Sequence, residues 1–225
     1  MSSPGFRIKK TIRRPDPALV ALFAGLPAAV IGDNMKRTAC MDARIRAMNR
    51  TPLLGVALTV RVRPGDSLML HKAMDMAEPG DVIVLDGGGY TGCAVAGELM
   101  ALWCRKRGLA GLVIDGCIRD YDSISALDFP VYAAGVNPNG PLREGGGEIN
   151  FPVSCGGLAV HPGDIIAGDA DGVVVVSPAD AADVAAKARL QYKEEAGIIA
   201  GIKNGSWDRS WVDPLLTAKG CEFTD

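Results

Sequence analysis

Residues 81–120, DVIVLDGGGYTGCAVAGELMALWCRKRGLAGLVIDGCIRD, contain the stretch that decides the predicted fold. A β-branched apolar run comes first, followed by a glycine-rich stretch, an amphipathic run from Ala96 to Arg107, a second apolar run and a polar turn. This order predicts a strand, a loop, a helix and a second strand. In such a crossover the start of the helix and the end of the second strand meet at one edge of the sheet. We therefore expect residues 97–100 to lie beside residues 115–120.

Further β-branched runs on both sides of this segment predict more strands of the same sheet. These runs span residues 55–62, 131–133, 157–160, 164–167 and 173–176. A Pro-Gly-Asp element at residues 64–66, 79–81 and 162–164 precedes a predicted strand in its last two copies, so we interpret it as a turn. Residues 169–172 predict a hairpin turn. Strands with intervening helices indicate an α/β fold.

Both ends of the chain are predicted to be helical. Asp16 and Pro17 form a typical helix start, and a second helical stretch is expected from Thr38 to Met48. A final helix is predicted from Pro178 to about Ile202. It is followed by a polar tail with two tryptophans, which suggests docking against another subunit.

Composition narrows the class of protein. The chain has 225 residues, of which 48% are hydrophobic and 22% charged, and a net charge of −2, which indicates neither a nucleic-acid partner nor a membrane surface. No apolar run approaches the roughly 20 residues of a membrane span, and no signal peptide is recognisable. The six cysteines form no CxxC pair and most lie inside apolar runs, so we expect reduced, buried thiols in a cytoplasmic protein.

Candidate site residues gather at the predicted sheet edge. The first turn of the central helix, Gly97–Met100, offers free N–H groups suited to a carboxylate. Arg119 can hold a carboxylate or stabilise an enolate oxygen, while Asp120 and Glu98 are hard oxygen ligands. Because the chain has only two histidines, these oxygens favour Mg²⁺ or Mn²⁺ over a His-rich zinc site. The plain alternative is a surface ion pair between Arg119 and Asp120.

A competing motif occurs in the same segment. Gly87, Gly89 and Gly92 follow the G-x-G-x-x-G spacing, and Asp115 lies at the end of the next predicted strand. This is the formal dinucleotide fingerprint, so an enzyme with a nicotinamide or adenosyl cofactor is a rival interpretation. We rank this interpretation lower because residues 151–176 lack the repeated βαβ pattern and because a dinucleotide site would not use Arg119 and Asp120.

Four segments carry a family resemblance: HKAMDMAEPGDVIVLDGGG (71–89), GELMALWCRKRGLAGLVIDGCIRD (97–120), FPVYAAG (129–135) and HPGDIIAGDADGVVVV (161–176). They resemble the RraA-like proteins, which include the 4-hydroxy-4-methyl-2-oxoglutarate aldolases. Catalytic members show an acidic residue, twenty residues and then Arg-Asp. Glu98 and Arg119-Asp120, separated by residues 99–118, fit that spacing.

The resemblance implies a layered β/β/α domain of the swivelling type, with residues 1–225 as a single domain. Its core would span about residues 28–200, between an N-terminal helical extension and a C-terminal tail. The family assembles as homotrimers or homohexamers with sites between subunits. The implied activity is metal-dependent cleavage of 4-hydroxy-2-oxo diacids to pyruvate and a second 2-oxo acid, with oxaloacetate decarboxylation beside it. The family also includes regulators that bind a ribonuclease, and such a non-catalytic role is the alternative.

The resemblance also assigns roles to single residues. Asp120 would bind Mg²⁺ or Mn²⁺ directly, and Glu98 would hold it through water. Glu195 of a neighbouring subunit, with Glu194 as the alternative, would act in the same way. The backbone of Gly97–Met100 would bind the substrate carboxylate, and Arg119 would contact the keto oxygen.

Overall fold

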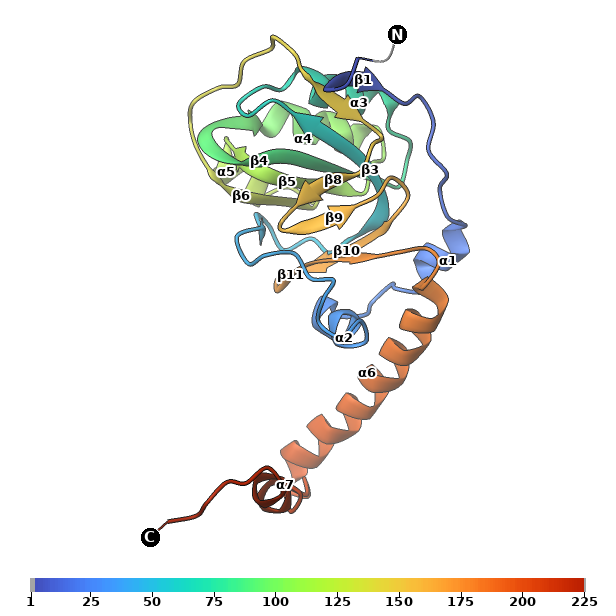
Figure 1. Cartoon of the computed structure of the whole chain (residues 1–225), viewed down its shortest axis with the longest axis vertical. Coiled ribbons are helices and arrows are strands. Elements are labelled where there is room, and N and C mark those ends of the chain that lie inside the picture. Colours follow the sequence, from blue (N-terminus) through green and yellow to red (C-terminus); the bar gives the residue numbers. More distant parts are fainter. Residues whose placement is uncertain (1–2, 225) are drawn as a thin grey trace. The chain divides into compact units, whose positions relative to one another are not determined.

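The computed structural model describes residues 3–224. The helices and strands follow in chain order in Figure 1. They are β1 (Phe6–Ile8), α1 (Pro17–Ala21), α2 (Ala28–Asp33), β2 (Arg46–Ala47), β3 (Leu53–Val62), α3 (Leu68–Met76), β4 (Asp81–Ala96), α4 (Glu98–Lys106), β5 (Gly111–Ile118), α5 (Tyr121–Ser125), β6 (Val131–Val136), β7 (Gly147–Ile149), β8 (Val153–Cys155), β9 (Leu158–Val160), β10 (Ile165–Asp169), β11 (Gly172–Val176), α6 (Ala181–Asn204) and α7 (Val212–Ala218).

The main sheet runs in the order β1-β7-β3-β4-β5-β6-β2, and the β10–β11 hairpin also pairs with β3. Neighbours among β3, β4, β5 and β6 are parallel and are joined by α3, α4 and α5 in turn. The Pro-Gly-Asp turns precede β4 and β10 as predicted, with Gly80 and Gly163 at positive φ. The mixed α/β fold is therefore confirmed.

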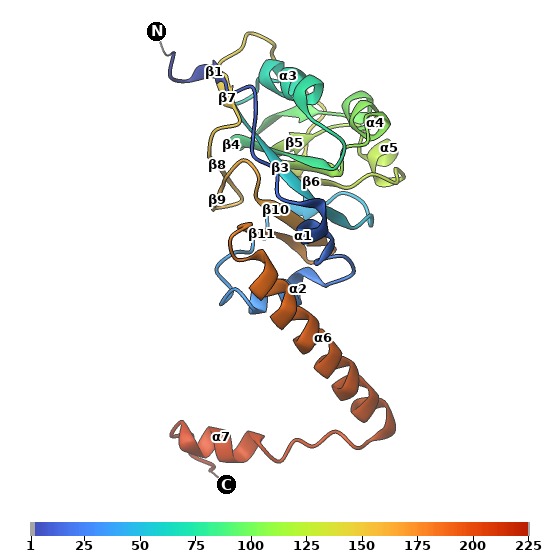
Figure 2. The ribbon, with the colours of Figure 1, turned by 90° about the vertical axis from the view of Figure 1, so that its right-hand side faces the viewer.

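Apolar side chains of the central strands point alternately to the two faces of the sheet, and each face is covered by a layer of other elements. Ile83 and Leu85 of β4 belong to a core cluster with residues of α3 and α4, whereas Val82 and Val84 belong to a cluster with β8, β9 and the β10–β11 hairpin. Figure 2 shows α3, α4 and α5 on one side and β8 and β9 on the other. A third cluster joins the outer face of the hairpin to α2 and the first turns of α6. These are the expected β/β/α layers.

The glycine-rich stretch is not the loop that the sequence predicts. Residues 87–92 belong to β4, which continues to Ala96 and keeps its pairing with β5 through three register shifts. Small residues allow this because a side chain at Gly87 would collide with the carbonyl oxygen of Asp115. The glycines thus serve a bulged strand instead of a strand-to-helix turn.

The predicted helix from Thr38 to Met48 is also wrong. Met41, Ile45 and Met48 have helical spacing and are buried, which made the pattern look helical. Their segment is held by strand contacts, with the Met41 N–H donating to Val173 O at 2.9 Å and the Met48 N–H to Val131 O at 2.8 Å. The helix start at Asp16 is confirmed, since its side chain accepts from Ala18 N.

The chain divides into two compact units, one ending at Ala188 and the other beginning at Arg189. Helix α6 starts in the first unit, close to its predicted position. In the second unit Arg209 stacks over the ring of Trp207, and α7 follows. None of the helices among the described residues is long and apolar enough to cross a membrane. All six cysteines are free thiols. Cys104, Cys117 and Cys155 are buried as expected, whereas Cys40 and Cys221 are exposed.

Candidate active site

Strand pairing brings the predicted site segments together. Ala96, the last residue of β4, pairs with Ile118, the last residue of β5, and the Arg119 N–H donates to Ala96 O at 3.0 Å. The next residues on the two sides are therefore Gly97-Glu98 and Arg119-Asp120. The start of α4 and the end of β5 meet at the edge of the sheet where parallel strands present their carboxyl ends.

Asp120 turns its side chain back toward α4. Its backbone has the left-handed angles φ 58° and ψ 42°, a conformation that aspartate tolerates better than most residues. Its Oδ2 accepts a hydrogen bond from the Glu98 N–H at 3.0 Å. A Cβ at Gly97 would collide with this oxygen, so the close approach of the two segments requires glycine at position 97.

Two N–H groups at the start of α4 remain available. Glu98 donates to Asp120, and the Met100 N–H donates to Gly97 O at 3.1 Å. The N–H groups of Gly97 and Leu99 have no partner among the described residues. They lie where the helix dipole is positive and can therefore receive an anion.

A cavity of about 130 Å³ opens between these segments. Gly97, Leu99, Met100, Arg119 and Asp120 all contribute to its wall. Sites for drug-sized ligands occupy roughly 300–1,000 Å³. The space is therefore suited to a small acid and not to a nucleotide.

Two further ionisable residues of the wall are absent from the predicted site. His71 comes from α3, and Arg143 comes from the loop before β7. His71 opens the first of the segments that carry the family resemblance, but a histidine inside an apolar run has no chemical signature of its own. Arg143 lies in a glycine-rich loop whose course could not be derived from its sequence.

The charges in the cavity are loosely paired. Arg119 Nε lies 3.8 Å from Asp120 Oδ2, and both side chains are nearly half exposed, so the pair is weak and both groups remain open to a ligand. Burial lowers the pKa of His71, and the positive charge of Arg143 lowers it further against the opposing effect of Asp75. His71 is therefore mainly neutral at pH 7 and can accept a proton.

The acidic residues predicted to act through water are placed differently. Glu98 contributes its backbone N–H to the site, but its side chain is not part of the cavity wall. Glu195 lies on α6 in the second unit, where its Oε1 accepts from Gln191 Nε2 at 2.9 Å. Glu194 beside it is exposed. The part of Glu195 in a neighbouring subunit's site stays a prediction.

The donor set fits a hydrated hard cation and not a preformed metal cage. Within residues 3–224, no group of three or more His, Cys, Asp or Glu side chains is arranged to hold a metal. Asp120 Oδ1 accepts no hydrogen bond from a described residue and is free to act as a ligand. Mg²⁺ keeps several waters and needs only one or two carboxylates together with substrate oxygens, and Asp120 meets this requirement.

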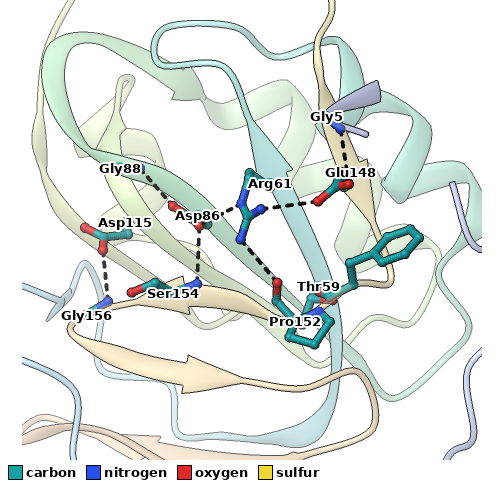
Figure 3. A network of polar contacts seen from close by, with 11 residues as sticks. Gly5, Thr59, Arg61, Asp86, Gly88, Asp115, Glu148, Pro152, Ser154 and Gly156 are labelled. Carbon is teal, nitrogen blue, oxygen red and sulfur yellow. Dashed lines mark hydrogen bonds and ion pairs between the residues drawn. The ribbon is translucent and has the colours of Figure 1, made fainter. Parts of the chain in front are cut away.

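The acidic residue of the dinucleotide fingerprint, Asp115, is not available to bind a cofactor. Asp115 is buried. Its Oδ2 accepts from the Gly156 N–H at 2.9 Å (Figure 3) and also from Arg44 Nη2 at 2.8 Å. This carboxylate fixes the β8–β9 hairpin to the sheet and has no free face for a ribose. Together with the position of the glycines inside β4, these contacts leave the fingerprint without a binding site.

A family model matches more than half of the chain. The model of the RraA-like family, described as Aldolase/RraA, matches residues 28–175. The chain belongs to the RraA-like family. An RraA-like protein of Halalkalibacterium halodurans, named "Putative 4-hydroxy-4-methyl-2-oxoglutarate aldolase", is 37% identical over 199 residues, which cover 88% of this chain and 95% of that protein.

Two solved structures are similar to this chain over most of its length. An uncharacterized protein of Pseudomonas syringae pv. tomato superimposes with a TM-score of 0.75 and 26% identity, over 87% of this chain and 96% of that one. Streptomyces coelicolor RraAS2, described as an unusual member of the RNase ES inhibitor RraA protein family, gives a TM-score of 0.74 and 25% identity, over 84% and 100%. The proteins similar to this chain thus include one named for catalysis and one described by an inhibitor family.

Proposed function

We propose that this RraA-like protein is a divalent-metal-dependent lyase. It cleaves 4-hydroxy-2-oxo diacids of the 4-hydroxy-4-methyl-2-oxoglutarate type to pyruvate and a second 2-oxo acid, and it decarboxylates oxaloacetate. The observation that carries the proposal is the cavity of about 130 Å³, which brings two free N–H groups, a guanidinium and a carboxylate together at a helix start. The aldolase names of its relatives support the same reaction class.

The chain's own residues bind and polarise the substrate. The N–H groups of Gly97 and Leu99 hold the carboxylate next to the keto group, at the positive end of α4. Arg119 donates to the keto oxygen and stabilises the negative charge that develops there as the C3–C4 bond breaks. The bond electrons move toward C3 and the keto oxygen, which gives the enolate of pyruvate.

Asp120 would hold Mg²⁺ or Mn²⁺ through its free Oδ1. When bound, the cation supplies Lewis acidity at the carboxylate and keto oxygens of the substrate. Asp120 Oδ2 meanwhile accepts from the Glu98 N–H, which keeps the carboxylate aimed at the cavity. Glu98 and Glu195 of a neighbouring subunit are proposed to contact the cation through water, in a homotrimer or homohexamer.

The deciding experiment measures pyruvate release from oxaloacetate and from 4-hydroxy-4-methyl-2-oxoglutarate. Each assay is run with EDTA and again after Mg²⁺ or Mn²⁺ is restored. Arg119→Ala should lower kcat by roughly 10²-fold, as loss of an oxyanion donor does. Arg105→Ala, an exposed arginine on the same α4, should leave turnover unchanged.

Two results would count against the proposal. Equal turnover in Arg119→Ala and Arg105→Ala would remove the assigned site. If neither substrate yields pyruvate with any divalent metal, the non-catalytic alternative gains, in which the chain binds a ribonuclease or another protein. The description of the Streptomyces coelicolor relative as belonging to an RNase inhibitor family is the observation that favours this second function.

A further inference from the structure

Cleavage of a 4-hydroxy-2-oxo diacid leaves one proton without a carrier. The C4 hydroxyl must lose its proton as the C4–O bond becomes a carbonyl, and C3 must later gain one. Arg119 stays protonated at all accessible pH values and cannot take the proton. Glu98 is not part of the cavity wall and is assigned to the cation through water, and Asp120 is assigned to the cation directly.

We propose that His71 is the catalytic base that takes the C4 hydroxyl proton and then, as the imidazolium, delivers it to C3. This inference rests on the proposed lyase function and deepens it. Two observations carry it: His71 is part of the wall of the same small cavity as Arg119 and Asp120, and no hydrogen bond joins its ring to a described residue.

The position of His71 is fixed by its helix. Its backbone N–H donates to Ser67 O at 3.0 Å in the first turn of α3, and the neighbouring Met69, Leu70 and Ala73 are buried in the core. The half-buried imidazole is thereby held at the cavity by a rigid element instead of a loop. A base on a packed helix meets the geometric precision that proton transfer needs.

The surrounding charges keep the ring in the form that a base requires. Arg143 from the loop before β7 disfavours the imidazolium, while Asp75, one turn further along α3, opposes this effect. Arg119 and Asp120 face the same cavity with opposite charges. Burial is the largest influence and, together with Arg143, lowers the pKa of His71 below its ordinary value.

The step balances without an added reactant. A ring nitrogen of His71 takes the hydroxyl proton, the O–H electrons form the new C4 carbonyl, and the C3–C4 electrons form the enolate. The imidazolium then returns the proton to C3, which gives the methyl group of pyruvate and neutral His71. Oxaloacetate has no C4 hydroxyl to deprotonate, because its C4 is an ionised carboxylate that leaves as carbon dioxide. The enolate that remains takes its C3 proton from water. Only the aldol substrate therefore requires a base.

This difference defines the test. In the Mg²⁺-loaded protein, His71→Gln should lower kcat for 4-hydroxy-4-methyl-2-oxoglutarate by about 10²-fold or more, the usual contribution of a general base. The loss should be at least tenfold larger than the loss with oxaloacetate. Free imidazole should partly restore aldol cleavage in His71→Ala. His161→Gln, at the only other histidine of the chain, is the matched control, since His161 belongs to a separate cavity.

A measurement without turnover complements the kinetics. The imidazole signals of His71 and His161 can be followed by NMR in the metal-free protein and assigned with the His161→Gln variant. His71 should titrate below its ordinary value of about 6.5, and Arg143→Ala should raise the midpoint.

Several outcomes would overturn the inference. If His71→Gln lowers kcat equally for the two substrates, His71 has a structural role. If aldol cleavage is unchanged in this variant, His71 has no role in the reaction. A His71 ring that is mainly protonated at pH 7 would be unable to act as the base. If the wild-type protein decarboxylates oxaloacetate but the His71 experiments give these results, only the inference about His71 fails. If the wild-type protein cleaves neither substrate, the proposed lyase function fails as well.

Discussion

At the scale of single residues, the backbone of Asp120 decides how its role can be tested. Its φ of 58° strains alanine but is tolerated by asparagine, whose amide oxygen can still accept from the Glu98 N–H. We therefore expect Asp120→Asn to keep the wild-type Tm and lose Mg²⁺-dependent turnover, because the carboxylate charge is gone. Thermal unfolding and pyruvate release measure the two effects.

The matched control for this variant is the neighbouring acid on α5. Asp122 is exposed and lies two positions further along the chain, so Asp122→Asn removes the same charge without touching the cavity. An Asp120→Asn protein with the wild-type Mg²⁺ response would show that the ligand assignment is wrong.

At the scale of elements, a buried carboxylate joins β7 to β1 and β3. Glu148 accepts from Arg7 at 2.6 Å, from Arg61 at 3.2 Å and from the Gly5 N–H at 3.3 Å (Figure 3 shows the last two). Burial alone would raise the pKa of Glu148, but these donors outweigh it and lower the pKa below its ordinary value. Glu148 thus stabilises the fold while it is ionised.

We expect Glu148→Gln to lower the free energy of unfolding by roughly 1–2 kcal/mol at pH 7, because the two arginine partners are half exposed and screened by water. The stabilisation is complete above the ordinary glutamate pKa and is lost as the pH falls through the lowered value. The difference between the two proteins should therefore shrink below about pH 4.5 in denaturant titrations. Glu144→Gln, which breaks an exposed pair with Arg63, should change little. A pH-independent difference would contradict the ionic origin of the effect.

Some of the strands could be predicted from the sequence and others could not. Strands such as β3 and β5 were predictable because β-branched runs between glycine and proline turns have few other solutions. The continuation of β4 through residues 87–92 was not, since glycines leave no side-chain alternation to read. The segment of Met41, Ile45 and Met48 misled because burial at helical spacing also arises where an irregular chain follows a sheet.

Part of the candidate site was predictable for a related reason. Gly97–Met100 and Arg119-Asp120 follow consecutive elements of one crossover, so chain topology alone brings them together. His71 and Arg143 reach the same cavity from α3 and from the loop before β7. Their meeting depends on packing of the whole sheet, and neither residue pattern encodes it.

At the scale of the whole molecule, the proposed sharing of sites between subunits can be tested by complementation. Asp120→Asn and Glu195→Gln should each be inactive alone. In a co-assembled equal mixture, about a quarter of the sites in a cyclic oligomer would pair an intact Asp120 with an intact Glu195, so about a quarter of the wild-type activity should return. A mixture of Asp120→Asn with Arg119→Ala is the control, because both changes affect the same subunit's part of the site. No recovery in the first mixture would place Glu195 outside the site.

Strand β5, which directly precedes Arg119 and Asp120, is completely buried. Each of its eight residues is buried, and it lies between β4 and β6 within the parallel part of the sheet. Amide hydrogens in such a strand exchange with solvent only when the domain opens globally, whereas those of edge strands exchange through local openings. Arg119 and Asp120 directly follow this most protected segment. Fluctuations that release the edge strands should therefore leave the two residues in place, and heat inactivation should coincide with the exchange of the β5 amides.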